Sequence, residues 1–247
     1  MSRASSEATR SKRQLALDVS ATLAAFADVD AVVLFGSVAR GDAKPSSDID
    51  LMVVADHEPD PIDLRRRLPP DFREGCLSLV CRSSHQFLKL LAQGDSFAAH
   101  LHREGVILHD RSQLVTDALS SPLPQGSADD ELAKHLRRLR TLEDLRQFNG
   151  YFLFCYARLY GIAKSIVMVG LQRRGIPNFD RRQAFALFKS EHPAVEHEVD
   201  LVVRLAPFYD VVMHGEQRAL EKPYEGVAAE RMAASVIGAI KAIARVA

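Results

Sequence analysis

Two aspartates separated by one residue, Asp48 and Asp50, are the side chains in this sequence best placed to do chemistry. They stand at the mouth of an apolar run, Ile49 to Val54, whose β-branched content is typical of a buried strand. Side chains alternate along a strand, so we expect both carboxylates on one face of the sheet. Mg²⁺ prefers hard oxygen ligands and is usually held by one or two carboxylates together with substrate phosphates. The pair therefore predicts a magnesium site.

A glycine and a serine, Gly36 and Ser37, lie upstream of the aspartates and directly after a second apolar run, residues 31–35. Glycine lets the backbone approach a ligand closely, and serine offers a hydroxyl and an amide at the start of a turn. Together they could cradle phosphate oxygens. Arg40 and Lys44 follow in the same stretch. Each could touch a phosphate, although solvent-facing basic residues beside a loop need no ligand to explain them.

The stretch from Leu34 to Leu51 resembles the signature of the polymerase-beta-like nucleotidyltransferases, in which a Gly-Ser pair precedes a short helix and two aspartates one residue apart. The order of strands and helices over residues 31–109 is also similar to that family's minimal domain. The resemblance implies Mg²⁺ and a nucleoside triphosphate, with ATP as the first choice. It also implies that an acceptor attacks the α-phosphate and that pyrophosphate leaves. On this resemblance the metal-binding and catalytic residues are Asp48 and Asp50, and the nucleotide-binding residues are Gly36, Ser37, Arg40 and Lys44.

The aspartate pair also has a purely structural interpretation, because Ser46, Ser47 and Asp48 are all good cap or turn residues. The family signature is moreover incomplete. Enzymes of the family usually carry a third carboxylate on the next strand, here expected near Cys76 to Cys81, and alternation places Ser78 at that position. A neutral hydroxyl cannot accept a proton at neutral pH.

Two acids just upstream, Asp71 and Glu74, could replace the missing carboxylate if the strand began earlier. Two hypotheses about function therefore stay open. The first is a Mg²⁺-dependent enzyme that moves a nucleoside monophosphate onto a hydroxyl of a small molecule or protein. The second is a catalytically weakened nucleotide-binding or antitoxin-like regulatory module.

Composition limits the partners. The 247 residues carry a formal net charge of zero, so no overall basic field attracts nucleic acid, and RNA as a substrate is disfavoured. No uninterrupted apolar run approaches the ~20 residues that span a bilayer, and no signal-like segment stands at the start. We expect a cytoplasmic protein without a membrane partner, and a homodimer is left open.

The pattern of apolar residues predicts an α+β protein: an N-terminal α/β domain with a mixed sheet, then an all-α helical bundle. Pro, Gly, Ser and Asp concentrate between the two, which marks a boundary. We expect a flexible tail at residues 1–12, the nucleotidyltransferase domain at 13–118, a linker at 119–129 and the bundle at 130–247. Its helices are expected over residues 130–147, 151–173, 181–190, 194–213 and 227–246.

The bundle resembles, more weakly, those that accompany such domains in antibiotic nucleotidyltransferases and in the paired MNT and HEPN proteins. It departs from the HEPN ribonuclease pattern, because Tyr209 stands where that pattern has arginine. Without the cation we expect no RNA cleavage, and we interpret His214 as a helix-end residue. The aromatic residues expected to pack in the core are Tyr151, Phe152, Phe154, Tyr156 and Tyr160.

Overall fold

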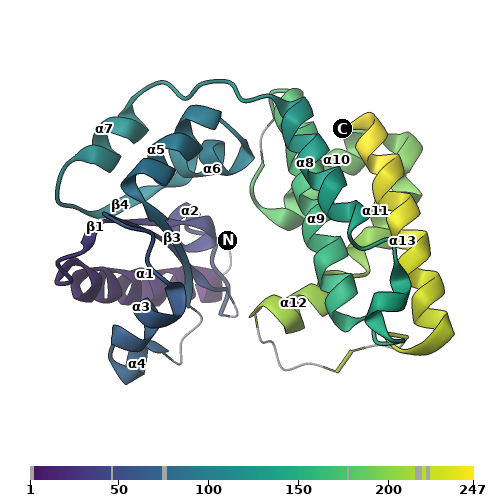
Figure 1. The fold of residues 1–247 in the computed structure, drawn as a ribbon, viewed down its shortest axis with the longest axis horizontal. Coiled ribbons are helices and arrows are strands. Elements are labelled where there is room, and N and C mark those ends of the chain that lie inside the picture. Colours follow the sequence, from purple (N-terminus) through teal and green to yellow (C-terminus); the bar gives the residue numbers. More distant parts are fainter. Residues whose placement is uncertain (1–2, 46, 74–76, 177, 215–218, 221–222) are drawn as a thin grey trace. The chain divides into compact units, whose positions relative to one another are not determined.

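The structure is a computed structural model that describes residues 3–45, 47–73, 77–176, 178–214, 219–220 and 223–247. The chain divides into two compact units, Met1–Gly126 and Ser127–Ala247 (Figure 1). Their junction falls within the stretch 119–129, where the sequence is rich in Pro, Gly, Ser and Asp. The first unit has an α/β fold and the second has an all-α fold, so the predicted α+β class is confirmed.

A four-stranded mixed sheet forms the centre of the N-terminal unit, with the strand order β3-β2-β1-β4. Strand β1 (Val29–Phe35) pairs antiparallel with both β2 (Ile49–Ala55) and β4 (Val106–Asp110). Strand β3 (Leu77–Ser83) runs parallel to β2. The antiparallel pairing of β1 with β2 is what brings the end of β1 beside the start of β2.

The sheet is covered on both faces because its strands alternate between two apolar cores. Val32 and Leu34 of β1 pack with Leu51 and Val53 of β2 against α1 (Arg3–Ala24). The intervening residues, among them Val33, Phe35 and Met52, pack against α5 (Ser84–Gln93) and α6 (Ser96–Glu104). Figure 1 shows α1 on one side of the sheet and α5 and α6 on the other.

The remaining helices of this unit are short. Helix α2 (Gly36–Arg40) follows β1 directly, α3 (Pro61–Arg67) and α4 (Pro70–Arg73) lie between β2 and β3, and α7 (Leu114–Ser120) follows β4. Helix α5 begins with a capping box, in which Ser83 Oγ accepts from the Gln86 amide and the Gln86 side chain accepts from the Ser83 amide.

The N-terminal helix starts earlier than the sequence pattern indicates. Residues 3–12, predicted as part of a flexible tail, belong to α1. The sequence hides this start because the segment has few apolar residues. Its less exposed positions, including Ala8, Thr9 and Lys12, nevertheless continue the helical face of Leu15 and Ala16. The polar segment is thus helical because the later turns of the same helix pack against the sheet.

The C-terminal unit is a helical bundle built around α9 (Leu153–Arg173). The other helices are α8 (Ala128–Arg140), α10 (Arg181–Glu191), α11 (Glu196–Val203), α12 (Ala206–His214) and α13 (Gly226–Val246). Two 3₁₀ turns, η1 (Leu145–Phe148) and η2 (Pro193–Val195), connect them. Two predicted long helices are therefore interrupted: 130–147 ends at Arg140, and 194–213 breaks around Arg204 and Leu205.

The aromatic residues of the bundle confirm the prediction only in part. Phe152, Tyr156 and Tyr160 are buried, and the Tyr156 hydroxyl donates to the carbonyls of Pro223 and Ala229. The prediction was wrong for Phe154, which is 60% exposed, and for Tyr151, which is 43% exposed. Tyr151 precedes α9, and Phe154 lies on the side of its first turn that faces away from the core. The side chain of His214 lies outside the described residues.

By length and composition alone, one helix of the described residues, α9, could cross a membrane. Its most apolar window is 61% buried inside the bundle. A central bundle helix must be apolar on most sides in order to pack against its neighbours, which accounts for this composition.

Two glycines that end helices in the left-handed conformation test the packing of the N-terminal unit. Gly94 (φ +57°) ends α5, and a methyl group there would lie 1.9 Å from the carbonyl oxygen of Pro124. We expect Gly94→Ala to lower the free energy of unfolding by about 2–5 kcal/mol, because left-handed strain of about 1–2 kcal/mol adds to backbone displacement of about 1–3 kcal/mol.

The matched control is Gly41→Ala, because Gly41 (φ +88°) ends α2 with no atom within 4 Å of the added methyl group. Here only left-handed strain applies, so the expected loss is about 1–2 kcal/mol. Denaturant unfolding followed by circular dichroism gives both values. Equal losses in the two variants would contradict the predicted contact.

Candidate functional site

The site centres on the contact between Gly36 and Asp50. Phe35, the last residue of β1, is the cross-strand partner of Asp50 near the start of β2. The next residue, Gly36, has a φ of +74° and begins α2. A methyl group at Gly36 would lie 2.3 Å from Asp50 Oδ2 and 3.2 Å from its Cγ. The carboxylate therefore lies directly against the glycine backbone, in space that any side chain would fill.

The orientation of Asp50 follows from strand alternation. Its neighbours Ile49 and Leu51 pack into the core beside α1, whereas Met52 packs into the core beside α5 and α6. Asp50 therefore faces the same side as Met52. Asp48 immediately precedes the strand and is half-buried. A common orientation of Asp48 and Asp50 remains a prediction.

Ser78 lies beside Asp50, at the position where the sequence analysis expects the third carboxylate. The parallel register of β2 and β3 pairs Asp50 with Ser78 and Met52 with Val80. Leu77 and Leu79 pack on the α1 side, so Ser78 faces the same side as Asp50. The strand does not start early enough to place Asp71 there, because Asp71 lies in α4. Glu74 lies outside the described residues.

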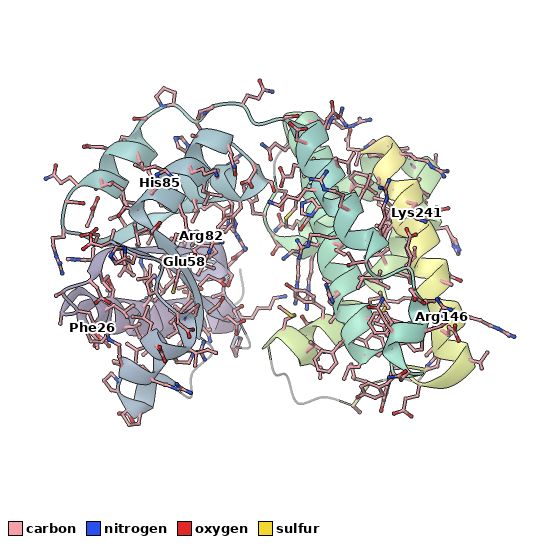
Figure 2. The ribbon with its side chains drawn as sticks, viewed as in Figure 1. Phe26, Glu58, Arg82, His85, Arg146 and Lys241 are labelled. Carbon is pink, nitrogen blue, oxygen red and sulfur yellow. The ribbon has the colours of Figure 1, made fainter. Side chains whose placement is uncertain are left out.

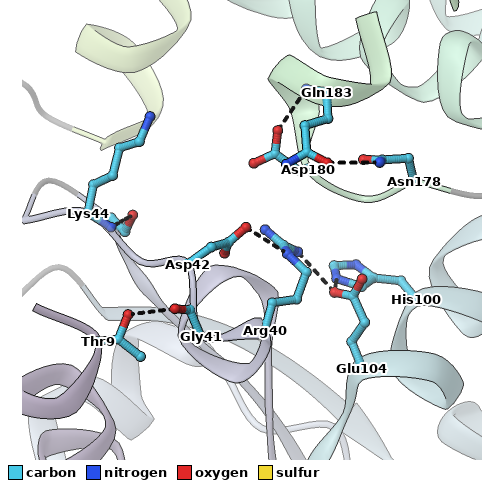
Figure 3. A network of polar contacts seen from close by, with 11 residues as sticks. Thr9, Arg40, Gly41, Asp42, Lys44, His100, Glu104, Asn178, Asp180 and Gln183 are labelled. Carbon is cyan, nitrogen blue, oxygen red and sulfur yellow. Dashed lines mark hydrogen bonds and ion pairs between the residues drawn. The ribbon is translucent and has the colours of Figure 1, made fainter. Parts of the chain in front are cut away.

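The loop between α2 and β2 connects the glycine to the first aspartate. The amides of Gly41 and Asp42 both donate to the carbonyl of Ser37. Lys44 and Ser47 close a second turn, in which the Lys44 amide donates to Ser47 Oγ and the Ser47 amide donates to the Lys44 carbonyl. The side chain of Lys44 extends from this loop and is exposed (Figure 3).

Arg40, at the end of α2, forms ion pairs with two carboxylates. Its Nη1 donates to Glu104 Oε2 over 2.9 Å, and its Nε donates to Asp42 Oδ2 over 3.3 Å (Figure 3). His100 Nε2 lies 3.0 Å from the same Glu104 oxygen. The guanidinium thus binds carboxylates of its own unit. Arg40 therefore has a structural role, which the sequence motif does not show.

These groups are sufficiently buried to shift their ionisation. Burial alone would raise the pKa of Glu104, but hydrogen bonds from His100 and Arg40 outweigh it and lower the pKa. Burial would likewise lower the pKa of Arg40, and its bonds to Glu104 and Asp42 raise it instead. Glu104 and Arg40 are therefore both charged at neutral pH, and their ion pair ties α2 to α6.

An aromatic contact supplements the ion pairs. The ring of Phe35 meets Phe97 and His100 of α6 edge to face, with centroids 5.6 Å apart in each case. Such pairs favour this geometry because the positive ring edge meets the negative ring face. Helix α6 consequently contacts the chain on both sides of Gly36, through Phe35 before it and Arg40 after it.

The described residues fit a magnesium ion only when a phosphate completes the site. No three His, Cys, Asp or Glu side chains among them converge as a metal-binding group. The Asp50 carboxylate occupies the space that a side chain at Gly36 would fill, so one ligand oxygen already lies against the backbone at which the phosphates would bind. One or two carboxylates plus phosphates are the usual magnesium set in such sites, so Asp48 and Asp50 would hold the ion.

Several residues around the site were missed by sequence reasoning. Glu104 and His100 belong to α6 and are far from Arg40 in the chain, so no local spacing connects them. Thr9 and Lys12 were assigned to a tail, but Thr9 Oγ1 donates to the Gly41 carbonyl and Lys12 Nζ donates to the Ser47 carbonyl. The only available signal was their place on the helical face that continues from Leu15.

Residues 18–114 match the family model described as Polymerase beta, Nucleotidyltransferase. The match falls on the part of the chain in which the sequence resembles a nucleotidyltransferase domain, and it agrees with that resemblance. A solved structure described as a toxin-antitoxin with AMP-PNP is 19% identical, covers 55% of this chain and 97% of its own, and has a TM-score of 0.29. A structural likeness this low supports no further argument. No curated protein matches the chain.

The buried ion-pair network predicts a pH-dependent contribution to stability. We expect Glu104→Gln to lower the free energy of unfolding at pH 7 by about 1–3 kcal/mol, because Arg40 loses the more buried of its two charged partners. Since the folded-state pKa of Glu104 is lowered, its contribution is present above the unfolded pKa of about 4.3 and is lost as the pH falls through the folded value. Chemical unfolding of wild type and variant from pH 7 to pH 3 measures this.

Glu58→Gln is the control, because Glu58 pairs with Arg82 at the surface of the same unit (Figure 2), where the side chains are 46% and 39% exposed. Its expected cost is within about 1 kcal/mol. A deficit of Glu104→Gln that stayed constant down to pH 3, or that equalled the control, would contradict the assignment.

Proposed function

We propose that the chain is a Mg²⁺-dependent nucleotidyltransferase that moves a nucleoside monophosphate from a nucleoside triphosphate to a hydroxyl group. In this proposal Asp48 and Asp50 hold the metal, and the backbone at Gly36 and Ser37 holds the triphosphate. The observation that carries it is the position of the Asp50 carboxylate against the bare backbone of Gly36, within residues that match a nucleotidyltransferase family.

The proposed reaction is a substitution at the α-phosphorus of the nucleotide. The acceptor oxygen forms a bond to the α-phosphorus, the bond from that phosphorus to the bridging oxygen breaks, and pyrophosphate leaves with the bond electrons. A bound magnesium ion would align the phosphates and neutralise charge. Asp48 and Asp50 supply the negative charge that holds it. Gly36 lets the Asp50 carboxylate lie against its backbone, and the Ser37 backbone amide and hydroxyl offer donors to the phosphates.

The reaction also requires a base that takes the proton of the acceptor hydroxyl. A carboxylate next to Asp50 would take that proton, but Ser78 stands there with a neutral hydroxyl. This register supports the second candidate, a catalytically weakened nucleotide-binding or antitoxin-like regulatory module. Both candidates share nucleotide binding and differ in turnover.

The partners we propose follow from the same site and from composition. ATP is the first nucleotide to test, and the acceptor is a small molecule or a protein side chain. The neutral formal charge gives no support to nucleic acid or a charged membrane surface as partner. A cytoplasmic location and a homodimer remain proposals for experiment.

The metal assignment predicts the effect of removing both charges. We expect Asp48→Asn combined with Asp50→Asn to weaken binding of ATP in Mg²⁺ at least about tenfold, which corresponds to about 1.4 kcal/mol, while the melting temperature stays near that of the wild type. Isothermal titration calorimetry measures the affinity. Asp63→Asn, which removes an exposed carboxylate of α3, is the control and is expected to bind normally. Unchanged affinity in the double variant would remove the assignment.

The missing third carboxylate predicts a gain of activity. We expect Ser78→Asp to raise Mg²⁺-dependent pyrophosphate release with a suitable acceptor by about tenfold or more, since a positioned general base typically contributes 10²- to 10⁴-fold. Ser78→Asn, nearly the same in size but unable to accept the proton, is the control and is expected to give no gain.

Assays of turnover also distinguish the enzyme from the regulatory module. Turnover by the wild type with ATP, CTP, GTP or UTP supports the enzyme, whereas binding without turnover supports the regulatory module. If Ser78→Asp lowered an existing activity and Asp71→Asn abolished it, the base would be Asp71 and the role of the Ser78 position would be refuted.

A further inference from the structure

The first turns of α1 reach the loop that carries the proposed metal ligand. Thr9 Oγ1 donates to the carbonyl of Gly41 over 3.2 Å (Figure 3), and Lys12 Nζ donates to the carbonyl of Ser47 over 2.7 Å. We name residues 41–48, of which all but residue 46 are described, the α2–β2 loop. Both donors come from one helix, and each donates to a carbonyl at a different end of this loop.

The two donors share one face of α1. Thr9 and Lys12 are three residues apart, so they lie on the same side of the helix. Both are half-buried, whereas Arg10, Ser11 and Arg13 around them are exposed. The face that carries them continues into the apolar core beside the sheet. The two bonds are therefore anchored to the sheet through the rest of α1.

Ala43 of the loop packs in the core beside α1, and the Asp42 side chain pairs with Arg40. The main-chain bonds of the loop are more local. Asp42 is bonded back to Ser37, and Lys44 is bonded to Ser47, but these bonds join residues close in sequence. By contrast, the bond from Thr9 joins residues 32 apart in the sequence, and the bond from Lys12 joins residues 35 apart. They alone, among the hydrogen bonds of the loop backbone carbonyls described above, fix both ends against a distant element.

We propose that Thr9 and Lys12 are positioning residues for the nucleotide site, which hold the α2–β2 loop so that Asp48 is presented beside Asp50. This inference rests on the proposed function. Ser47 directly precedes Asp48, so the bond from Lys12 fixes the peptide that leads into the metal ligand. If Asp48 is already held in place, less conformational entropy is lost when the ion and the triphosphate bind.

The experiment uses the full chain with Thr9→Val and Lys12→Met combined, and hydrogen–deuterium exchange as the first measurement. The Asp42 amide is bonded to Ser37 of α2, and the Lys44 and Ser47 amides are bonded within the loop, so all three report on its opening. We expect their exchange to become about tenfold faster, while amides of the central strands keep their protection. A near-normal melting temperature shows that the unit remains folded.

The second measurement is the affinity for ATP in Mg²⁺ by titration calorimetry. We expect the dissociation constant of the double variant to rise about tenfold. Thr9→Ser combined with Lys12→Arg keeps both donors and is expected to restore the affinity. Arg13→Met removes an exposed positive charge from the same helix and is expected to leave both affinity and exchange unchanged. This control separates the bond to Ser47 from a general effect of charge.

Three results overturn the inference. Unchanged loop exchange in the double variant shows that the two side chains do not hold the loop. Faster exchange with unchanged affinity shows that the held loop does not position Asp48. A wild-type chain that binds no ATP in Mg²⁺ refutes the proposed function and the use assigned to Thr9 and Lys12, and the exchange data then still show whether they hold the loop.

Discussion

The carboxylate of Asp50 pressed against the backbone of Gly36 is the constraint on which the rest of the N-terminal unit depends. A methyl group at Gly36 would lie 2.3 Å from Asp50 Oδ2, and the φ of +74° excludes most other residues independently. The contact needs an antiparallel pair of strands in one register, with Phe35 opposite Asp50. Any slip by one residue would turn Asp50 to the opposite face of the sheet and separate it from the glycine.

The surrounding elements support that contact from both faces of the sheet. On one face, α6 contacts the bend through the ring of Phe35 and through the ion pair of Arg40 with Glu104. On the other, α1 packs beneath the strands and its first turns reach the α2–β2 loop. A short five-residue helix such as α2 has little stability by itself, so its position must come from these neighbours.

Local patterns in the sequence were enough to predict the strand and the bend at the centre of the candidate site, but not the residues that support them. The strand at Asp50 and the bend at Gly36 each follow from a few adjacent residues, and the place of Ser78 follows from alternation on the next strand. The ion pair of Arg40 with Glu104 could not be predicted, because Glu104 is 64 residues away and no period connects the two residues. The exposure of Phe154 was missed for a related reason: spacing shows that a residue can face a core, but tertiary packing decides which face is covered.

The most direct test is a crystal structure of the full chain with Mg²⁺ and a non-hydrolysable ATP analogue. Our account predicts one cation bound by carboxylate oxygens of Asp48 and Asp50 and by phosphate oxygens, with the triphosphate lying against the backbone of Gly36 and Ser37. A nucleotide bound elsewhere on the chain, or an Asp50 carboxylate turned away from Gly36, would contradict it.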